Sequence, residues 1–510
     1  MAHRFNLGRR AGLLLPLSAV RGPAGDLGSY ADAGRVAEWL LSAGCSLWQL
    51  LPLNEVSPGQ DSPYSASSSC ALEPVFIDLS AVPDLDGLSH DEEQELLRLR
   101  REPRVDFEAC RKVKRGALSR AFRRFLQRGG AGDRDLQAFR AGHAAWIEDW
   151  ALYRALHEER RRSWRDWEAP LRDREPAALA EARARLRERI DELCYVQWIA
   201  DSQWRKGRAQ ANAKGVKVLG DLPFMVAGDS ADVWSFQRFF RFDANVGVPP
   251  DAYSAEGQDW GLPVPRWEEM RSSGDPWLHQ RAERAAELYD AFRVDHVVGL
   301  YRTYARPLDK SAPFFIPADE VRQKQQGERI LQLLGEKAEV LAEDLGTVPD
   351  FVRASLAAQE IPGTKVLRWE NDQGVPRDVT RFSHVSVAVT GTHDTEALAS
   401  WWEGLESWER EHQLAQPQLA PLRGPEQEQY TPQTRSALLA LAYAAASDAL
   451  LIPVTDALGW RERMNTPGTV GPHNWTFRLP WTLEELFSAP EAVAAARELA
   501  HLGERHGRKV

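Results

Sequence analysis

Short apolar runs alternate with stretches of helical periodicity along most of this chain. Each run is bounded by Gly, Pro or polar turn residues, as β-strands commonly are. Amphipathic segments such as 30–41, 278–289 and 349–358 lie between the runs and predict helices. Strands that alternate with helices pair in parallel, and eight such units predict an α/β fold, the closed (β/α)8 or TIM barrel. The predicted strands are 11–17, 46–53, 216–223, 292–299, 339–346, 364–370, 384–391 and 449–456.

The predicted units are unevenly spaced because long segments interrupt the barrel. Residues 86–214 lie between the second and third strands and are rich in Arg, Glu, Ala and Leu at helical spacing, most clearly over 175–204. We expect a mostly helical insertion there, within one catalytic domain that spans residues 1–510. Segment 247–261 is rich in Pro, Gly and polar residues, so we expect an active-site loop insertion over 245–275.

Composition narrows the class of protein. Hydrophobic residues make up 43% and charged residues 27% of the chain, as in globular proteins, and a net charge of −10 disfavours nucleic-acid binding. The four cysteines have no metal-binding or redox spacing, which predicts free thiols in a reducing cytoplasm. No apolar run reaches the roughly 18 residues that a membrane span needs. Arg9, Arg10 and the apolar residues after them are similar to a twin-arginine export signal, but we interpret them as the first strand.

Three of the predicted strands end in a carboxylate. Asp295 lies in AFRVDHV, Glu343 in EVLAEDLG and Asp394 in VAVTGTHD. Barrel active sites are built at the C-terminal ends of the strands, so the three acids are predicted to share one mouth. Glycosidic bond chemistry needs such a set of carboxyl groups. Taken singly, each acid also fits an ordinary role as an ion-pair partner or a helix N-cap.

The neighbours of these acids predict different roles for them. Arg293 and Asp295 are two residues apart, so a strand places both side chains on one face. A guanidinium favours the ionised form of a nearby carboxyl, as a nucleophile requires. Glu343 has no such neighbour and is the better general acid. Glu343 and Asp344 face opposite ways in a strand, so one of them enters the mouth while the other caps a turn.

Further polar and aromatic residues lie on the loops that follow the strands. His296 and the His393–Asp394 pair are suited to hydrogen-bond sugar hydroxyls. The chain holds 19 tryptophans, and indole rings stack on the apolar faces of sugars, although most are expected to fill the core. For each loop residue, scaffolding of the loop is the alternative. The other candidates for this mouth are Tyr64, Asp221, Tyr253, Trp260, Asn465 and Pro467.

Longer phrases occur in order along the chain, among them LGSYADAG, DSPYSASS, GDLPFMVAGDSADVW, GVPPDAYSAEGQDWG, FRVDHVVGL, LAEDLGTVP, GTHDT and RMNTPGT. Together they resemble the amylomaltases or disproportionating enzymes, the 4-alpha-glucanotransferases of glycoside hydrolase family 77 in the α-amylase clan. The resemblance implies an elaborated barrel without a C-terminal β-domain and a retaining double displacement. By motif it implies that Asp295 is the nucleophile, Glu343 the acid/base and Asp394 the transition-state stabiliser. Residues that match substrate-binding positions are Arg293, His393, Tyr253 and Trp260.

The resemblance also implies what the enzyme acts on. Its donors and acceptors are expected to be maltooligosaccharides and α-1,4-glucans, with glucose as acceptor or product, and it needs no metal or organic cofactor. A hydrolase of the same clan is the nearest alternative, because the chemistry is the same until the acceptor arrives. A catalytically inactive glycan-binding scaffold is the other alternative, which the three intact acids disfavour. Leu262 and Pro265 stand where many members have Asn and Tyr, which we expect to affect acceptor binding. No nucleic-acid or membrane partner is expected.

Overall fold

The core of the structure is a closed barrel of eight parallel strands. The computed structural model describes residues 7–23, 27–250, 256–422, 424, 428–508 and 510. Around the barrel the strand order is β1-β14-β13-β10-β9-β6-β3-β2. The strands are β1 (Arg10–Leu14), β2 (Leu47–Gln49), β3 (Lys217–Leu222), β6 (Ala291–Val294), β9 (Glu339–Ala342), β10 (Gly363–Val366), β13 (Ser386–Val389) and β14 (Ala449–Pro453). All eight predicted barrel strands are confirmed, and residues 10–14 form one of them, paired with β14 and β2.

Both faces of these strands are buried, which explains why the strands read as continuous apolar runs rather than alternating ones. Side chains such as Leu47, Leu219 and Leu341 fill the barrel interior. Their neighbours Trp48 and Val218 point outward and pack in the main hydrophobic core. Successive side chains of a strand point to opposite faces. One apolar run therefore supplies residues both to the barrel interior and to the core between the barrel and its helices.

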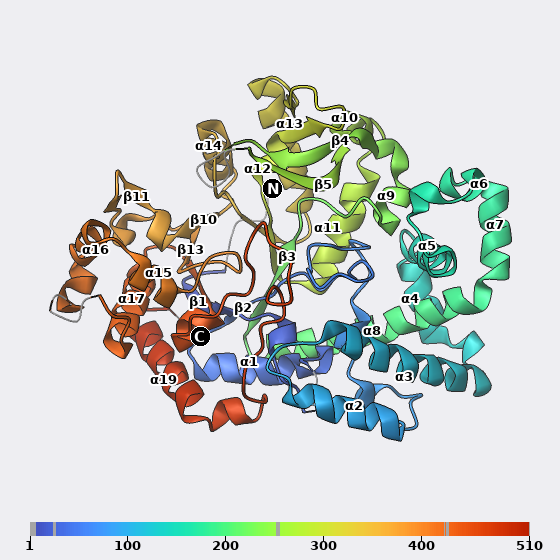
Figure 1. The fold of residues 1–510 in the computed structure, drawn as a ribbon, viewed down its shortest axis with the longest axis horizontal. Helices are drawn as coiled ribbons and strands as arrows, with labels where there is room; N and C mark the ends of the chain where they lie inside the picture. The colour runs from blue at the N-terminus through green and yellow to red at the C-terminus, as the bar shows by residue number, and fades with distance from the viewer. Residues whose placement is uncertain (1–6, 24–26, 251–255, 423, 425–427, 509) are drawn as a thin grey trace.

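A ring of helices covers the outside of the barrel (Figure 1). Successive members of the ring contact one another in the order α17, α19, α1, α8, α11, α13 and α14. None of the helices in the part of the chain that the structure describes is both long and apolar enough to cross a membrane. The ring helices are α1 (Ala33–Ser42), α8 (Arg187–Ala213), α11 (Pro276–Leu288), α13 (Glu320–Leu334), α14 (Asp350–Ala358), α17 (Pro432–Ala444) and α19 (Pro490–Arg505).

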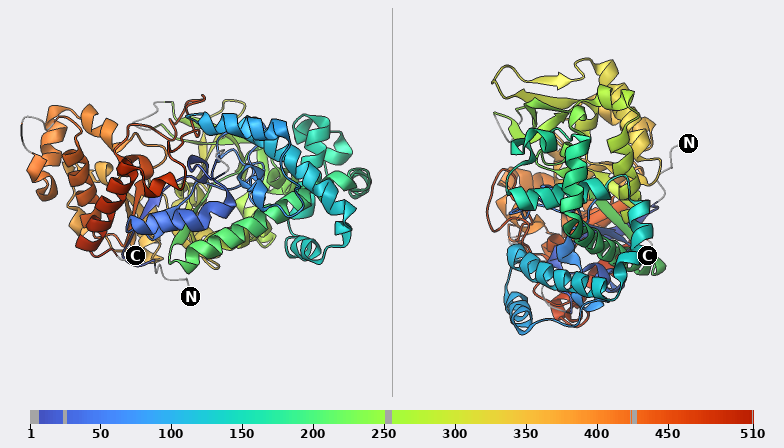
Figure 2. Two further views of the ribbon diagram at one scale, coloured as in Figure 1. Left: turned by 90° about the horizontal axis from the view of Figure 1, so that it is seen from below. Right: turned by 90° about the vertical axis from the view of Figure 1, so that its right-hand side faces the viewer.

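Helices fill the long interval between β2 and β3 and lie at one end of the molecule, opposite α15 (Leu398–Gly404) and α16 (Ser407–Leu414) (Figures 1 and 2). The segment 175–204, which has the clearest amphipathic pattern, is divided at Leu186 into two helices. The helices before α8 are α2 (His90–Arg101), α3 (Phe107–Gln127), α4 (Arg134–Gly142), α5 (Ile147–Arg160), α6 (Ala169–Arg172) and α7 (Pro176–Arg185).

A second, antiparallel sheet stands beside the barrel, with strand order β5-β4-β7-β8. Its strands are β4 (Phe240–Val248), β5 (Gln258–Pro265), β7 (Thr303–Pro307) and β8 (Phe314–Ile316). Much of segment 245–275 is therefore strand and helix α10 (Trp267–Ser272), where the Pro and Gly content indicated a loop. Leu262 and Pro265 lie on β5 rather than in a loop. The sheet was missed because its strands carry Gly, Pro and charged residues, and one of its faces does not pack into the core.

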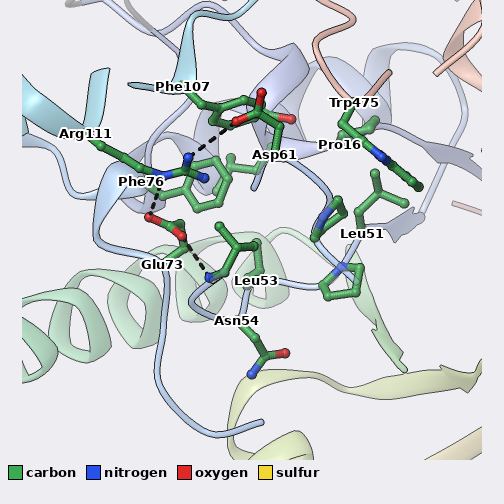
Figure 3. A pocket seen from close by; sticks show the side chains of 15 residues that line it. Pro16, Leu51, Leu53, Asn54, Asp61, Glu73, Phe76, Phe107, Arg111 and Trp475 are labelled. Atoms are coloured by element: carbon green, nitrogen blue, oxygen red, sulfur yellow. Dashed lines mark hydrogen bonds and ion pairs between the residues drawn. The ribbon is translucent and has the colours of Figure 1, made fainter. Parts of the chain in front are cut away.

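Arg111 of α3 connects the helical region to the loop that follows β2 (Figure 3). Its Nη1 lies 3.4 Å from Asp61 Oδ1, and its Nε lies 3.5 Å from Glu73 Oε1. Glu73 is only 5% exposed and also accepts a hydrogen bond from the Val56 amide. Burial raises the pKa of the Glu73 carboxyl and the Arg111 charge partly offsets this rise. These residues line a small cavity of about 30 Å³ and hold the loop that carries Tyr64.

Replacing Arg111 by Met should lower the free energy of unfolding by about 1–3 kcal/mol, because Glu73 then stays buried without its cation. Urea denaturation of Arg111→Met and the parent measures the difference. Arg124→Met is the matched control, since Arg124 lies on the same helix but pairs with Asp86 where both side chains are at least half exposed. Its effect should stay within about 0.5 kcal/mol. An equal loss of unfolding free energy in Arg111→Met and Arg124→Met would show that Arg111 does not stabilise the buried Glu73.

Candidate functional site

A cavity of about 500 Å³ opens at the C-terminal end of the barrel strands. Asp295 follows β6, Glu343 follows β9 and Asp394 follows β13, and all three side chains line this cavity. The antiparallel sheet supplies part of the wall through Trp260 on β5 and Gly247 on β4. The structure thus brings the three strand-end acids into one mouth, as barrel closure requires of residues at one rim.

Arg293 is the buried centre of a hydrogen-bonded group at this rim. Its Nη2 lies 2.8 Å from Asp295 Oδ1 and 2.8 Å from Asp221 Oδ2. The Tyr64 hydroxyl donates to the same Asp221 oxygen at 2.6 Å. Burial raises the pKa of Asp295 to about 6, although the charge of Arg293 acts in the opposite direction. Arg293 does favour the ionised form, as predicted from its spacing, but the loss of water around Asp295 outweighs it.

Glu343 is held by a backbone amide rather than by a cation. The His296 N–H donates to Glu343 Oε2 at 2.6 Å, from a residue in the left-handed region at φ 46°. Burial and the charge of Asp295 raise the pKa of Glu343 to about 8. Asp344 points the other way and accepts the Thr364 amide at 2.7 Å, so the alternation predicted for this pair of acids is observed.

His296 itself is neutral near pH 7, because burial lowers its pKa to about 4. Its ring lies edge-on to Trp260, with centroids 4.9 Å apart, and edge-on to Phe224 at 5.8 Å. A neutral imidazole offers one donor and one acceptor, and both suit hydroxyl groups. Trp260 and His296 therefore present an apolar face and a polar edge to the same cavity.

Asp394 differs from the other two acids because hydrogen bonds stabilise its charge. Its Oδ2 lies 3.3 Å from His393 Nε2, and its Oδ1 accepts the Asn465 amide at 2.7 Å. Burial opposes ionisation, but His393 and Asn465 outweigh it and hold the pKa of Asp394 well below its usual value. Its side chain is 45% exposed, so a charged carboxylate faces the cavity beside two carboxyls that resist ionisation.

The remaining predicted residues lie at different depths. Tyr64 stacks on His393 with ring centroids 5.1 Å apart, and Trp475 lies 5.5 Å from Tyr64. Asp221 was predicted to bind substrate, but its side chain is fully buried behind Arg293 and supports the site from the rear. Pro467 is exposed two residues after Asn465. Tyr253 lies outside the described residues.

Several cavity residues escaped the sequence prediction. Trp369 follows barrel strand β10, at a strand end like the three acids, and is 43% exposed. Tyr304 and Phe315 come from the antiparallel sheet, which was not predicted, and Arg302 directly precedes its strand β7. The long side chains of Arg302, Tyr304 and Arg306 alternate with the smaller Thr303 and Ala305, and this was the available signal for a half-exposed strand.

The arrangement suits acid–base and nucleophilic chemistry on a neutral ligand. It offers one carboxyl beside a cation, one carboxyl that retains its proton near neutral pH, and one charged carboxylate with fixed orientation. Two carboxyls with separated proton affinities are what glycosidic bond cleavage uses. Within the described residues, no group of three or more His, Cys, Asp or Glu side chains is placed to hold a metal ion.

Comparison with known proteins agrees with this geometry. A family model described as 4-alpha-glucanotransferase matches residues 15–484. The 4-alpha-glucanotransferase of Thermus thermophilus is 33% identical over 520 residues, covering 98% of this chain and 100% of the relative. The chloroplastic/amyloplastic 4-alpha-glucanotransferase of Solanum tuberosum is 33% identical, covering 92% of this chain and 82% of the relative.

Among solved structures, the amylomaltase from Streptococcus agalactiae in complex with acarbose superposes with a TM-score of 0.85 at 26% sequence identity. The match covers 98% of this chain and 100% of that structure. Family and fold therefore agree over nearly the whole chain, including the strands that carry the three acids. This chain belongs to the 4-alpha-glucanotransferase family, glycoside hydrolase family 77.

Proposed function

We propose that this chain moves α-1,4-glucan segments between maltooligosaccharides by a retaining double displacement. The observation that carries the proposal is that Asp295 and Glu343 line one cavity with different proton affinities. Asp295 has the lower pKa of the two and Arg293 stabilises its charge, so it fits the nucleophile. Glu343 keeps its proton to a higher pH and fits the general acid.

In the first step, an Asp295 oxygen bonds to the anomeric carbon while the bond from that carbon to the leaving oxygen breaks. Glu343 gives its proton to the leaving oxygen, and a covalent glycosyl-enzyme results. In the second step, Glu343 takes the proton of an acceptor sugar hydroxyl, whose oxygen bonds to the anomeric carbon and releases Asp295. The His296 amide favours the ionised Glu343 and so supports its turn as a base.

Asp394 is the proposed transition-state stabiliser. Its carboxylate is ionised and its orientation is fixed by His393 and Asn465, so it is prepared to accept hydrogen bonds from ring hydroxyls. Such bonds strengthen as the sugar ring distorts toward the transition state. Trp260 and Trp369 are placed to stack on neighbouring glucose units of the same chain.

The proposed donors and acceptors are maltooligosaccharides and α-1,4-glucans, with glucose as acceptor or product. Acarbose bound to the Streptococcus agalactiae amylomaltase supports a glucan-like ligand for this cavity. A cytoplasmic location is proposed as well, because Cys45, Cys70 and Cys194 are buried free thiols.

Incubation with maltotriose should yield glucose together with a ladder of longer maltooligosaccharides, which chromatography resolves. The Asp295→Asn variant should lose at least about 1,000-fold of this activity, because the nucleophile is removed. Maltose and glucose alone would identify a hydrolase and overturn the proposal. Parent-like turnover by Asp295→Asn would overturn the assignment of the nucleophile.

The pH dependence of kcat/KM should be bell-shaped, since Asp295 must be ionised and Glu343 protonated in the free enzyme. The rate should fall as pH drops through the Asp295 pKa of about 6 and as pH rises through the Glu343 pKa of about 8. In Asp221→Asn the acidic limb should move to lower pH, because the Asp221 charge raises the pKa of Asp295.

Asp344→Asn is the matched control for this shift. The Asp344 charge raises the pKa of Glu343, so its removal should move the basic limb to lower pH and leave the acidic limb in place. A profile in which the two substitutions move the same limb would contradict the assignment of the two carboxyls.

A further inference from the structure

The antiparallel sheet has two different faces, and one of them forms a wall of the catalytic cavity. Val246 on β4 pairs with Ala305 on β7, and both are buried in the core. The next pair along these strands, Gly247 and Tyr304, lies on the opposite face, and both residues line the cavity. Because side chains alternate along a strand, this face belongs to the cavity over several strands.

Aromatic rings gather on this face beyond Gly247. Tyr304 on β7 pairs directly with Phe315 on β8, and their ring centroids lie 5.0 Å apart at 55°. Both residues are partly exposed and line the cavity that contains Asp295 and Glu343. Gly247 has no side chain of its own, and the Arg306 side chain lies over it. The cavity face of the sheet therefore carries Trp260 on β5 and the Tyr304–Phe315 pair on β7 and β8.

Arg302 supplies polar groups to the same face. It lies two residues before Tyr304, and its guanidinium carbon is 4.3 Å from the centroid of the Phe315 ring. The Arg302 Nε is buried, and no residue that the structure describes accepts a hydrogen bond from it. A buried donor without an acceptor is costly, so an acceptor supplied by a ligand in the cavity would stabilise it.

Rings beside hydrogen-bond donors match the chemistry of a glucose unit. A pyranose has apolar C–H faces that stack on aromatic rings and hydroxyls that accept from N–H groups. Trp260 lies on edge strand β5 and contacts His296, the residue after Asp295, whereas Tyr304 and Phe315 lie on β7 and β8 at the other side of the sheet.

We propose that Arg302, Tyr304 and Phe315 form a distal subsite, which binds a glucose unit of the α-glucan away from the bond that is broken. This inference rests on the proposed glucan transfer and adds a preference for longer chains. The subsite acts by holding an additional part of the substrate, so its contribution depends on the number of sugar units present.

The test compares kcat/KM for maltoheptaose and maltotriose as sole substrates. In Tyr304→Ala/Phe315→Ala the ratio of the two values should fall by about 10-fold relative to the parent, as expected for loss of an aromatic stacking contact. Tyr304→Leu/Phe315→Leu keeps apolar volume on the strands but removes the flat rings, and it should lower the ratio in the same direction. If the alanine variant fails to fold, the leucine variant still tests the role of the rings.

Phe314→Ala is the matched control, because Phe314 is the neighbouring residue of β8, points to the other face and is 40% exposed. Its ratio should equal that of the parent. An unchanged ratio in both Tyr304/Phe315 variants overturns the subsite, even when the parent transfers normally. A parent that makes no ladder from either substrate overturns the proposed function instead, so the two failures are distinguishable.

Discussion

A guanidinium that is 7% exposed lies within 2.8 Å of two carboxylates, and the catalytic end of the barrel is organised around it. Arg293 would be costly to bury alone, and Asp221 beneath it supplies the compensating charge. Arg293 donates to Asp221 through Nε and Nη2, and Nη2 also donates to Asp295. The Tyr64 hydroxyl donates to the same Asp221 oxygen, so the loop after β2 is positioned by the group that also holds Asp295, the proposed nucleophile. The loop is held from its other side by Arg111.

The three acids differ in how readily they ionise because their neighbours differ, and not because one is Glu and two are Asp. Asp295 and Glu343 both lose water on folding, yet Asp295 accepts a hydrogen bond from Arg293, whereas Glu343 accepts one from the His296 amide and interacts with the Arg293 charge without a direct bond. Asp394 sits more openly, and two hydrogen-bonding neighbours keep it charged. Three carboxyls in one cavity thus differ in how readily they ionise, and this difference is what the proposed nucleophile, acid and electrostatic stabiliser require at one pH.

The barrel could be predicted because its strands are buried on both faces, so each leaves an apolar run such as that before Asp295. The acids could be predicted because parallel strands bring their ends to one rim. The antiparallel sheet could not be predicted, because β4 and β5 contain Gly, Pro and charged residues and therefore show no apolar run. The sequence places Asp221 at the end of a strand, and the structure agrees. Only packing reveals that its side chain is fully buried and paired with Arg293.

The sheet that escaped prediction also bears on what attacks the glycosyl-enzyme. Both a hydrolase and a transferase can form that intermediate, and they differ in which hydroxyl reaches the anomeric carbon. The sheet adds the rings of Trp260, Tyr304 and Phe315 to the cavity that holds Asp295 and Glu343, and a sugar can stack on these rings whereas water cannot. An acceptor sugar bound by such contacts would have a high effective concentration in the cavity, and water would gain nothing from them. The second sheet thus supplies a physical reason for transfer that the three acids, common to both reactions, do not contain.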